Sequence, residues 1–186
     1  MDTTAAVRVS QLEPDDWAAL RQIRLEALAG APYAFSSTLA DETGMTQEQW
    51  RARITRSPSF IAWRDGEPVG LVGGFGRPPA AEPAGSEPGG SGPGAGHRDW
   101  HLVSMWVSPQ ARGTGVAEQL VEAVCASARA DGAARLTLWA TEVNARARAF
   151  YQRMGFLPTG ARQLVRPDEP DHWEEERALD LSQPAS

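Results

Sequence analysis

The chain has 186 residues and a formal net charge of -6 at pH 7, which fits one domain with a sizeable core and lacks the basic excess typical of nucleic-acid binders. Its single cysteine, Cys125, excludes an intrachain disulfide and a paired-cysteine zinc site. The three histidines have no ligand spacing, so we expect no metal. No segment resembles a secretory signal or reaches the about 20 apolar residues of a membrane span. We expect a cytoplasmic protein that binds neither nucleic acid nor membrane.

The first part of the chain predicts one strand and two helices. Residues 7–11 alternate weakly and indicate a short strand. After Pro14, apolar residues recur every three or four positions up to Gly30, which predicts an amphipathic helix. Thr46 begins a capping-box pattern and therefore predicts a second helix through about residue 56.

Residues 59–75 predict a hairpin, because two apolar runs flank the turn dipeptide Asp65-Gly66. Residues 77–97 follow and consist mainly of Gly, Pro, Ala and Ser. Such a segment buries too little apolar surface to offset its ordering entropy. We therefore expect a flexible loop at 77–97 within a single domain spanning 1–186, and not a linker between two domains.

The second half of the chain alternates strands and helices. The predicted elements are a strand over 100–109, a helix over 115–130, a strand over 134–140, a helix over 144–154, and two paired strands over 157–164 and 172–181. This order, together with the N-terminal elements, predicts a mixed α/β fold of the α+β-like kind.

The stretch "RGTGVA" at residues 112–117 is compatible with a tight turn, a phosphate cradle or a dinucleotide-binding fingerprint. No Gly-Lys-Ser/Thr follows, which excludes a Walker loop. Glu118 stands where the dinucleotide fingerprint needs its third glycine, which excludes that motif as well. A phosphate cradle remains, because Gly113 and Gly115 leave the amides of 113–118 accessible at a helix N-terminus, beside the charge of Arg112.

Two motifs resemble those of the GNAT superfamily of acetyl-CoA-dependent N-acetyltransferases. The first is "VSPQARGTGVA", matching at Val107, Pro109, Arg112, Gly115 and Ala117. The second is "NARARAFYQRMGF", matching at Asn144, Ala147, Tyr151, Gly155 and Phe156. The resemblance implies the GNAT acyl-CoA N-acyltransferase fold, with a central, mostly antiparallel mixed sheet flanked by helices.

The resemblance also implies acetyl-CoA as co-substrate. Backbone groups at the end of one strand would hold its pantetheine arm, and the glycine turn would hold its pyrophosphate. The implied cofactor-binding residues are Met105, Trp106, Val107, Arg112, Gly113, Thr114, Gly115, Val116, Ala117, Glu118 and Asn144. Asn144 is equally suited to be an ordinary helix cap.

The implied function is transfer of an acetyl group from acetyl-CoA to a primary amine, by direct attack through a tetrahedral intermediate. Tyr151 would be the general acid, because a phenol of pKa about 10 can hydrogen-bond to a departing thiolate whose thiol has a pKa of about 8.5. Two alternatives stay open. One is a catalytically silent acyl-CoA-binding or regulatory module, and the other is an acyltransferase that uses a longer acyl-CoA.

The general base is not identified by the resemblance. Some members place a glutamate five residues before the motif asparagine, and this chain has Trp139 there. Glu26, Glu42 and Glu142 are alternative carboxylates. A weakly basic amine, or a chain of water molecules, would need none of them.

The acceptor site is expected at the loop between the first two helices, where Tyr33 and Phe35 would form a wall. The acceptor would be a small-molecule amine or a protein amino group. The sequence leaves a homodimer open.

Overall fold

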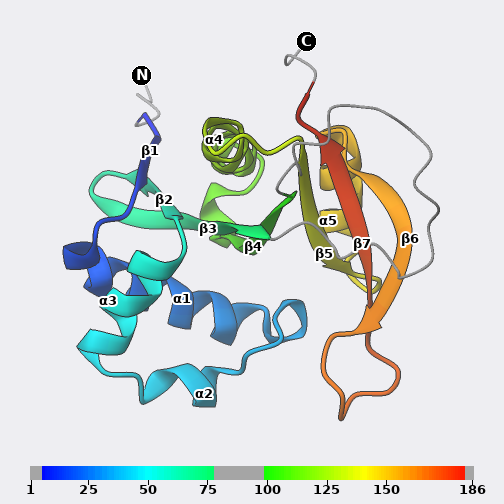
Figure 1. Ribbon diagram of the computed structural model, residues 1–186. Helices are drawn as coiled ribbons and strands as arrows, with labels where there is room; N and C mark the ends of the chain where they lie inside the picture. The colour runs from blue at the N-terminus through cyan, green and yellow to red at the C-terminus, as the bar shows by residue number, and fades with distance from the viewer. Residues whose placement is uncertain (1–5, 78–98, 183–186) are drawn as a thin grey trace.

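The computed structural model describes residues 6–77 and 99–182 (Figure 1). Within these residues, seven strands form one sheet in the order β1-β2-β3-β4-β5-β7-β6. The strands are β1 (Arg8–Gln11), β2 (Ser59–Arg64), β3 (Glu67–Arg77), β4 (Asp99–Val107), β5 (Arg135–Thr141), β6 (Leu157–Leu164) and β7 (Trp173–Asp180). Neighbouring strands run antiparallel, except that β4 and β5 are parallel. The predicted mixed, mostly antiparallel sheet is confirmed.

The helices cover both faces of this sheet, as Figure 1 shows. They are α1 (Trp17–Gly30), α2 (Leu39–Thr43), α3 (Gln47–Arg56), α4 (Val116–Ala130) and α5 (Ala145–Arg153). The first three lie on one face, and α4 and α5 lie on the other. Each face has its own buried apolar cluster, one built around α1 and α3 and the other around α4.

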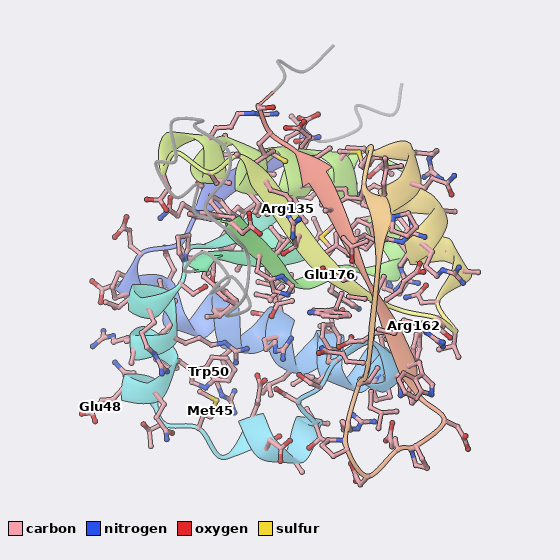
Figure 2. All side chains as sticks on the ribbon, turned by 45° about the vertical axis from the view of Figure 1, so that its right-hand side comes forward. Met45, Glu48, Trp50, Arg135, Arg162 and Glu176 are labelled. Atoms are coloured by element: carbon pink, nitrogen blue, oxygen red, sulfur yellow. The ribbon has the colours of Figure 1, made fainter. Side chains whose placement is uncertain are left out.

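The helical faces follow from the spacing of apolar residues. On α4, the buried residues recur every three or four positions, which places them on one side of the helix. On α3, Trp50 is fully buried, whereas Glu48 points away from the protein (Figure 2). The predicted amphipathic helices are therefore present because one side of each can pack on the sheet.

Short sequence motifs predicted the β2–β3 turn and the start of α3 correctly. Asp65 and Gly66 both have positive φ angles, of 54° and 83°, as a two-residue hairpin turn between β2 and β3 requires. Thr46 caps α3 and forms a capping box with Gln49. The predicted loop at 77–97 lies, except for Arg77, outside the described residues.

Two N-terminal details differ from the prediction. Residues Pro14–Asp16 form a separate 3₁₀ turn, so α1 begins at Trp17. The short helix α2 was not expected, although Thr38 caps it and forms a capping box with Asp41. Its five residues are too few for an apolar period to show in the sequence.

The sheet opens in its middle, between the parallel strands. Residues Asp99 to Leu102 of β4 pair with Arg135 to Leu138 of β5, and the pairing ends there. Just beyond, β4 carries a bulge opposite β3, where Ser104 has a φ of 58°. The bulge changes which side chains of β4 face the opening, and this opening holds the candidate site.

Candidate active site

A cleft of about 390 Å³ lies where β4, the start of α4 and α5 meet. Most of the residues predicted to bind the co-substrate line it: Met105, Trp106, Val107, Arg112, Gly113, Ala117, Glu118 and Asn144. Thr114, Gly115 and Val116 belong to the same turn and helix start but do not line the cleft. The two sequence motifs, which are separated by 26 residues, therefore meet at one cleft.

The glycine turn has the backbone shape that its sequence predicts. Gly113 and Gly115 have φ angles of 77° and 82°, in a region that residues with a side chain rarely adopt. Gly115 is also the N-cap of α4, so the unpaired amides of the first helical turn lie next to it. A Cβ atom added at either glycine would meet no protein atom within 4 Å and would project into open space. These properties fit a backbone cradle for an anionic phosphate group.

Side chains hold the cradle in place. The Arg112 Nε donates a hydrogen bond to the carbonyl oxygen of Val107, at 3.0 Å, and so ties the turn to the end of β4. The Thr114 hydroxyl donates to the Ala111 carbonyl oxygen and accepts from the Arg64 guanidinium. Arg112 thus has a structural bond in addition to the charge expected of it.

Asn144 is both a helix cap and a cleft residue. Its side-chain oxygen accepts a hydrogen bond from the Ala147 amide, at 3.0 Å, at the start of α5. Two arginines of α5, Arg146 and Arg153, also line the cleft. We did not predict these arginines from the sequence, since neither belongs to the motif positions. They add positive charge to the lining of the cleft.

Tyr151 lies at the junction of two cavities. It is buried, and its ring packs edge-on against Phe156, with 5.6 Å between the ring centroids. Burial raises its pKa. Within residues 6–77 and 99–182, its hydroxyl group has no hydrogen-bond partner. The Tyr151 side chain lines the large cleft and also a second cavity of about 80 Å³.

The second cavity lies between the ends of β4 and β5, beyond the last residue pair of these strands. Phe35 and Trp139 line it, and Tyr33 lines the neighbouring cleft. The loop after α1 therefore borders both cavities. Trp139, which stands where some members of the resembled superfamily carry a glutamate, is also one of the residues that line this cavity.

The three carboxylates considered as a base lie outside both cavities. Glu26 is exposed on α1. The Glu142 carboxylate accepts a hydrogen bond from Arg162, at 2.7 Å, at the sheet edge. Glu42 is buried in α2 and accepts hydrogen bonds from Arg24 and Arg53. The structure does not bring any of them next to Tyr151.

The environment of Glu42 favours its charged form. Burial alone would raise its pKa, but the hydrogen bonds and charges of Arg24 and Arg53 outweigh burial and hold the pKa below the ordinary 4.5. A carboxylate that is stabilised in this way is a weak base. No local sequence pattern indicates this cluster, because its three members come from three different helices.

Arg24 connects this cluster to the second cavity. Its guanidinium carbon lies 4.7 Å from the centre of the Phe35 ring, and one of its nitrogens donates to the Ser104 hydroxyl, at 3.3 Å. Phe35 and Ser104 both line the second cavity. A buried positive charge therefore lies directly behind the cavity wall.

Neither a metal centre nor a bilayer-spanning helix is found in the part of the chain that the structure describes. No group of three His, Cys, Asp or Glu side chains in 6–77 and 99–182 could hold a metal ion. Among the helices of these residues, none is long and apolar enough to cross a bilayer.

A central sheet that opens between two parallel strands, with a glycine turn suited to an anion at one end of the opening, is the arrangement expected of an acyl-CoA-dependent transferase. The model of the Acetyltransferase (GNAT) family matches residues 17–156, so the chain belongs to this family of acetyltransferases. No curated protein matches the sequence.

Solved structures share the fold over nearly the whole chain. Arabidopsis thaliana NAA60, solved in complex with acetyl-CoA, aligns with a TM-score of 0.71 at 15% identity and covers 96% of this chain and 100% of its own. The N-acetyltransferase from Staphylococcus aureus Mu50 aligns with a TM-score of 0.70 at 17% identity and covers 96% of this chain and 100% of its own. The ribosomal-protein-alanine N-acetyltransferase from Brucella melitensis aligns with a TM-score of 0.64 at 23% identity and covers 93% of this chain and 99% of its own. At these identities, the likeness shows the fold.

Proposed function

We propose that the protein transfers an acetyl group from acetyl-CoA to a primary amine by direct attack, with Tyr151 as the general acid. The observation that carries this proposal is the position of Tyr151, at the junction of the large cleft and the smaller cavity. The sulfur of a thioester held in the cleft and an amine held in the cavity would meet at this junction. Two of the structural neighbours are described as acetyl-CoA complexes, which supports the choice of co-substrate.

The residues of the cleft suit the parts of acetyl-CoA. The amides after Gly113 and the arginines of α5 would hold the phosphates. Met105 and Val107 line the cleft at the end of β4, beyond the last residue pair of β4 with β5, so the edge of β4 that faces β5 is unpaired here. Unpaired strand groups at this edge can hydrogen-bond the amides of the pantetheine arm. When bound, acetyl-CoA supplies the thioester carbonyl that the amine attacks.

Tyr151 would act on the leaving group. Its raised pKa keeps the phenol protonated at neutral pH, so the hydroxyl can donate a hydrogen bond, and then its proton, to the departing sulfur. The proton that the attacking nitrogen loses would restore the phenol, so that the products are the amide and free coenzyme A. Its hydroxyl has no competing partner in the described residues. The packing of the ring against Phe156 would hold the hydroxyl in one direction.

The experiment that tests this function measures release of free coenzyme A from acetyl-CoA, in the presence and absence of a panel of amines. Amine-dependent release above the hydrolysis background supports an N-acetyltransferase. Tight binding of acetyl-CoA without release under any condition would instead mean a silent binding module. Replacing acetyl-CoA by a longer acyl-CoA in the same assay tests the choice of acyl group.

A further inference from the structure

The acceptor cavity carries no charged lining among the described residues. Its lining residues are Ala34, Phe35, Leu102, Val103, Ser104, Met105, Trp139, Ala140, Thr141, Asn144, Ala147 and Tyr151. A carboxylate is the group that would attract an ammonium ion and take its proton. Since this wall has none, a protonated amine would lose its hydration here without a charged partner.

The charge behind the wall has the wrong sign for an ammonium ion. Arg24 is 3% exposed and Glu42 is 4% exposed, and Arg53 completes the cluster, so two guanidinium groups face one carboxylate. The cluster therefore carries an excess positive charge. Through Ser104 and Phe35, Arg24 lies against the cavity, where screening by water is weak. A positive charge at this place disfavours a second one in the cavity.

One polar group of the cavity lacks a partner. The Thr141 hydroxyl is buried, and it has no hydrogen-bond partner among the described residues. Buried hydroxyl groups normally have one. A neutral amine donates hydrogen bonds through its N–H groups and keeps its lone pair for attack, so the Thr141 oxygen can accept one of them.

The other charged groups near this wall are paired or lie outside the lining. Glu174 of β7 stands opposite Thr141 in the sheet register and accepts a hydrogen bond from Gln163. In the β6–β7 loop, Glu169 bonds to both Arg166 and His172. The acidic rim formed by this loop and β7 can draw protonated amines toward the site, while the cavity itself accepts the neutral form.

Amines differ widely in how often they are neutral. An alkylamine such as the lysine ε-amine has a pKa of about 10.4, so only about one molecule in 2,500 is neutral at pH 7. A peptide α-amine has a pKa of about 7.7–8.0, so about one molecule in six to eleven is neutral at pH 7. A site that does not remove the proton itself therefore favours the α-amine by about two orders of magnitude.

We propose that the acceptor is the α-amine of a peptide or protein N-terminus, bound in its neutral form, and not a lysine ε-amine or a polyamine. The cavity of about 80 Å³ holds only about five to eight water-sized groups, which suits a small first residue such as alanine. This inference rests on the proposed acetyl transfer and adds the class of acceptor.

The test compares two peptides of the same sequence, each beginning with alanine and containing one lysine. In one, the lysine is acetylated and the α-amine is free. In the other, the N-terminus is acetylated and the lysine is free. We expect kcat/KM at pH 7 to be at least tenfold higher for the free α-amine. Equal or better turnover of the lysine peptide, or turnover of simple alkylamines alone, overturns the inference and leaves acetyl transfer standing. Absence of coenzyme A release with every amine overturns both.

A pair of variants tests whether the absence of a carboxylate in the cavity selects the α-amine. Trp139→Glu puts a carboxylate into the cavity, and Trp139→Gln is the uncharged control. We expect the ratio of lysine-peptide to α-amine-peptide kcat/KM to rise at least tenfold in Trp139→Glu relative to Trp139→Gln. Both substrates are measured on one preparation, so partial unfolding cancels in the ratio. An unchanged ratio means that the charge of the cavity does not select the amine, and the inference fails.

Discussion

Arg166 and Phe35 are 131 positions apart in the sequence, and the guanidinium of Arg166 donates a hydrogen bond to the carbonyl oxygen of Phe35, at 3.1 Å. Arg166 lies in the loop between β6 and β7, and Glu169 of the same loop holds its guanidinium. In Figure 1 this loop, in orange, extends below the sheet to the side where α1 and α2 lie. The bond holds the backbone of Phe35, a lining residue of the second cavity, from a loop that is far away in the sequence.

Arg166→Met should therefore weaken acceptor binding without affecting acetyl-CoA. Loss of one charged, partly buried hydrogen bond costs about 1 kcal/mol, so the acceptor KM should rise about threefold to tenfold. The KM for acetyl-CoA should stay constant. Arg162→Met removes another arginine–glutamate pair, at the sheet edge in Figure 2, and is the control. An equal change in both KM values would point to general loosening of the fold.

Tyr151→Phe removes one hydroxyl group and keeps the packing of the ring against Phe156. We expect kcat to fall by about 10²–10⁴-fold, the range of positioned acid catalysis, with unchanged acetyl-CoA affinity by calorimetry. The loss should shrink when a more acidic thiol is the leaving group, because such a thiolate needs less stabilisation. A loss of the same size with both thioesters would assign Tyr151 to substrate positioning.

Gly113→Ala and Gly132→Ala form a matched pair for the cradle. Both glycines have a φ of 77° and open space where a Cβ would stand, but Gly132 follows α4 and does not line the cleft. Each alanine should destabilise the protein by about 1–2 kcal/mol through its backbone conformation. We expect only Gly113→Ala to weaken acetyl-CoA binding, by at least tenfold in a titration calorimeter. Similar affinities in the two variants would argue against the cradle.

Thr141→Val separates a binding role from a structural one. Removing a buried hydroxyl that has no partner should leave the free energy of unfolding unchanged or raise it slightly. If the hydroxyl accepts a hydrogen bond from the incoming amine, the acceptor KM should still rise by about fivefold to tenfold. Denaturant unfolding and acceptor kinetics on the same protein check both parts. Full activity in the variant would remove Thr141 from the acceptor site.

Glu42→Gln should leave Arg24 and Arg53 without their counter-charge and destabilise the protein by about 3–5 kcal/mol at pH 7. Because the pKa of Glu42 is lower in the folded protein, its stabilising effect is present above the unfolded value of 4.5 and is lost as the pH falls through the folded value. The stability difference between wild type and variant should thus shrink below about pH 4.5.

Urea unfolding at pH 7 and pH 3.5 measures this difference. Glu48→Gln, on the exposed side of α3, serves as the control and should change stability by less than about 0.5 kcal/mol at either pH. If the difference in unfolding free energy between wild type and Glu42→Gln stayed constant with pH, the lowered pKa assigned to Glu42 in the folded protein would be wrong.

The sequence predicted the parts of the site that local motifs determine. Gly113 needs a positive φ and Asn144 begins a helix, and both requirements show in a few neighbouring residues. The capping box from Thr38 to Asp41 was equally local and could have revealed α2. The bulge at Ser104 was not visible, because it arises from how β4 pairs with β3.

The cluster around Glu42 could not be predicted from the sequence either, because its contacts join residues that are far apart in the chain. Its carboxylate is held by Arg24, 18 positions before it, and by Arg53, 11 positions after it. Single charged residues on helices are most often solvated, so a sequence pattern gives no reason to bury them. Only the packing of three helices on one face of the sheet brings these charges together.

The short pairing of β4 with β5 divides the sheet into two plates, β1 to β4 and β5 to β7, joined by a seam of four residue pairs. Such a sheet bends more easily along the seam than within either plate. A pantetheine arm bound in the opening would restrict this bending, because it would contact both plates beyond the point where β4 and β5 separate. Amide hydrogen exchange along the C-terminal part of β4 should then slow on acetyl-CoA binding, while exchange in the hairpin of β2 and β3 stays the same.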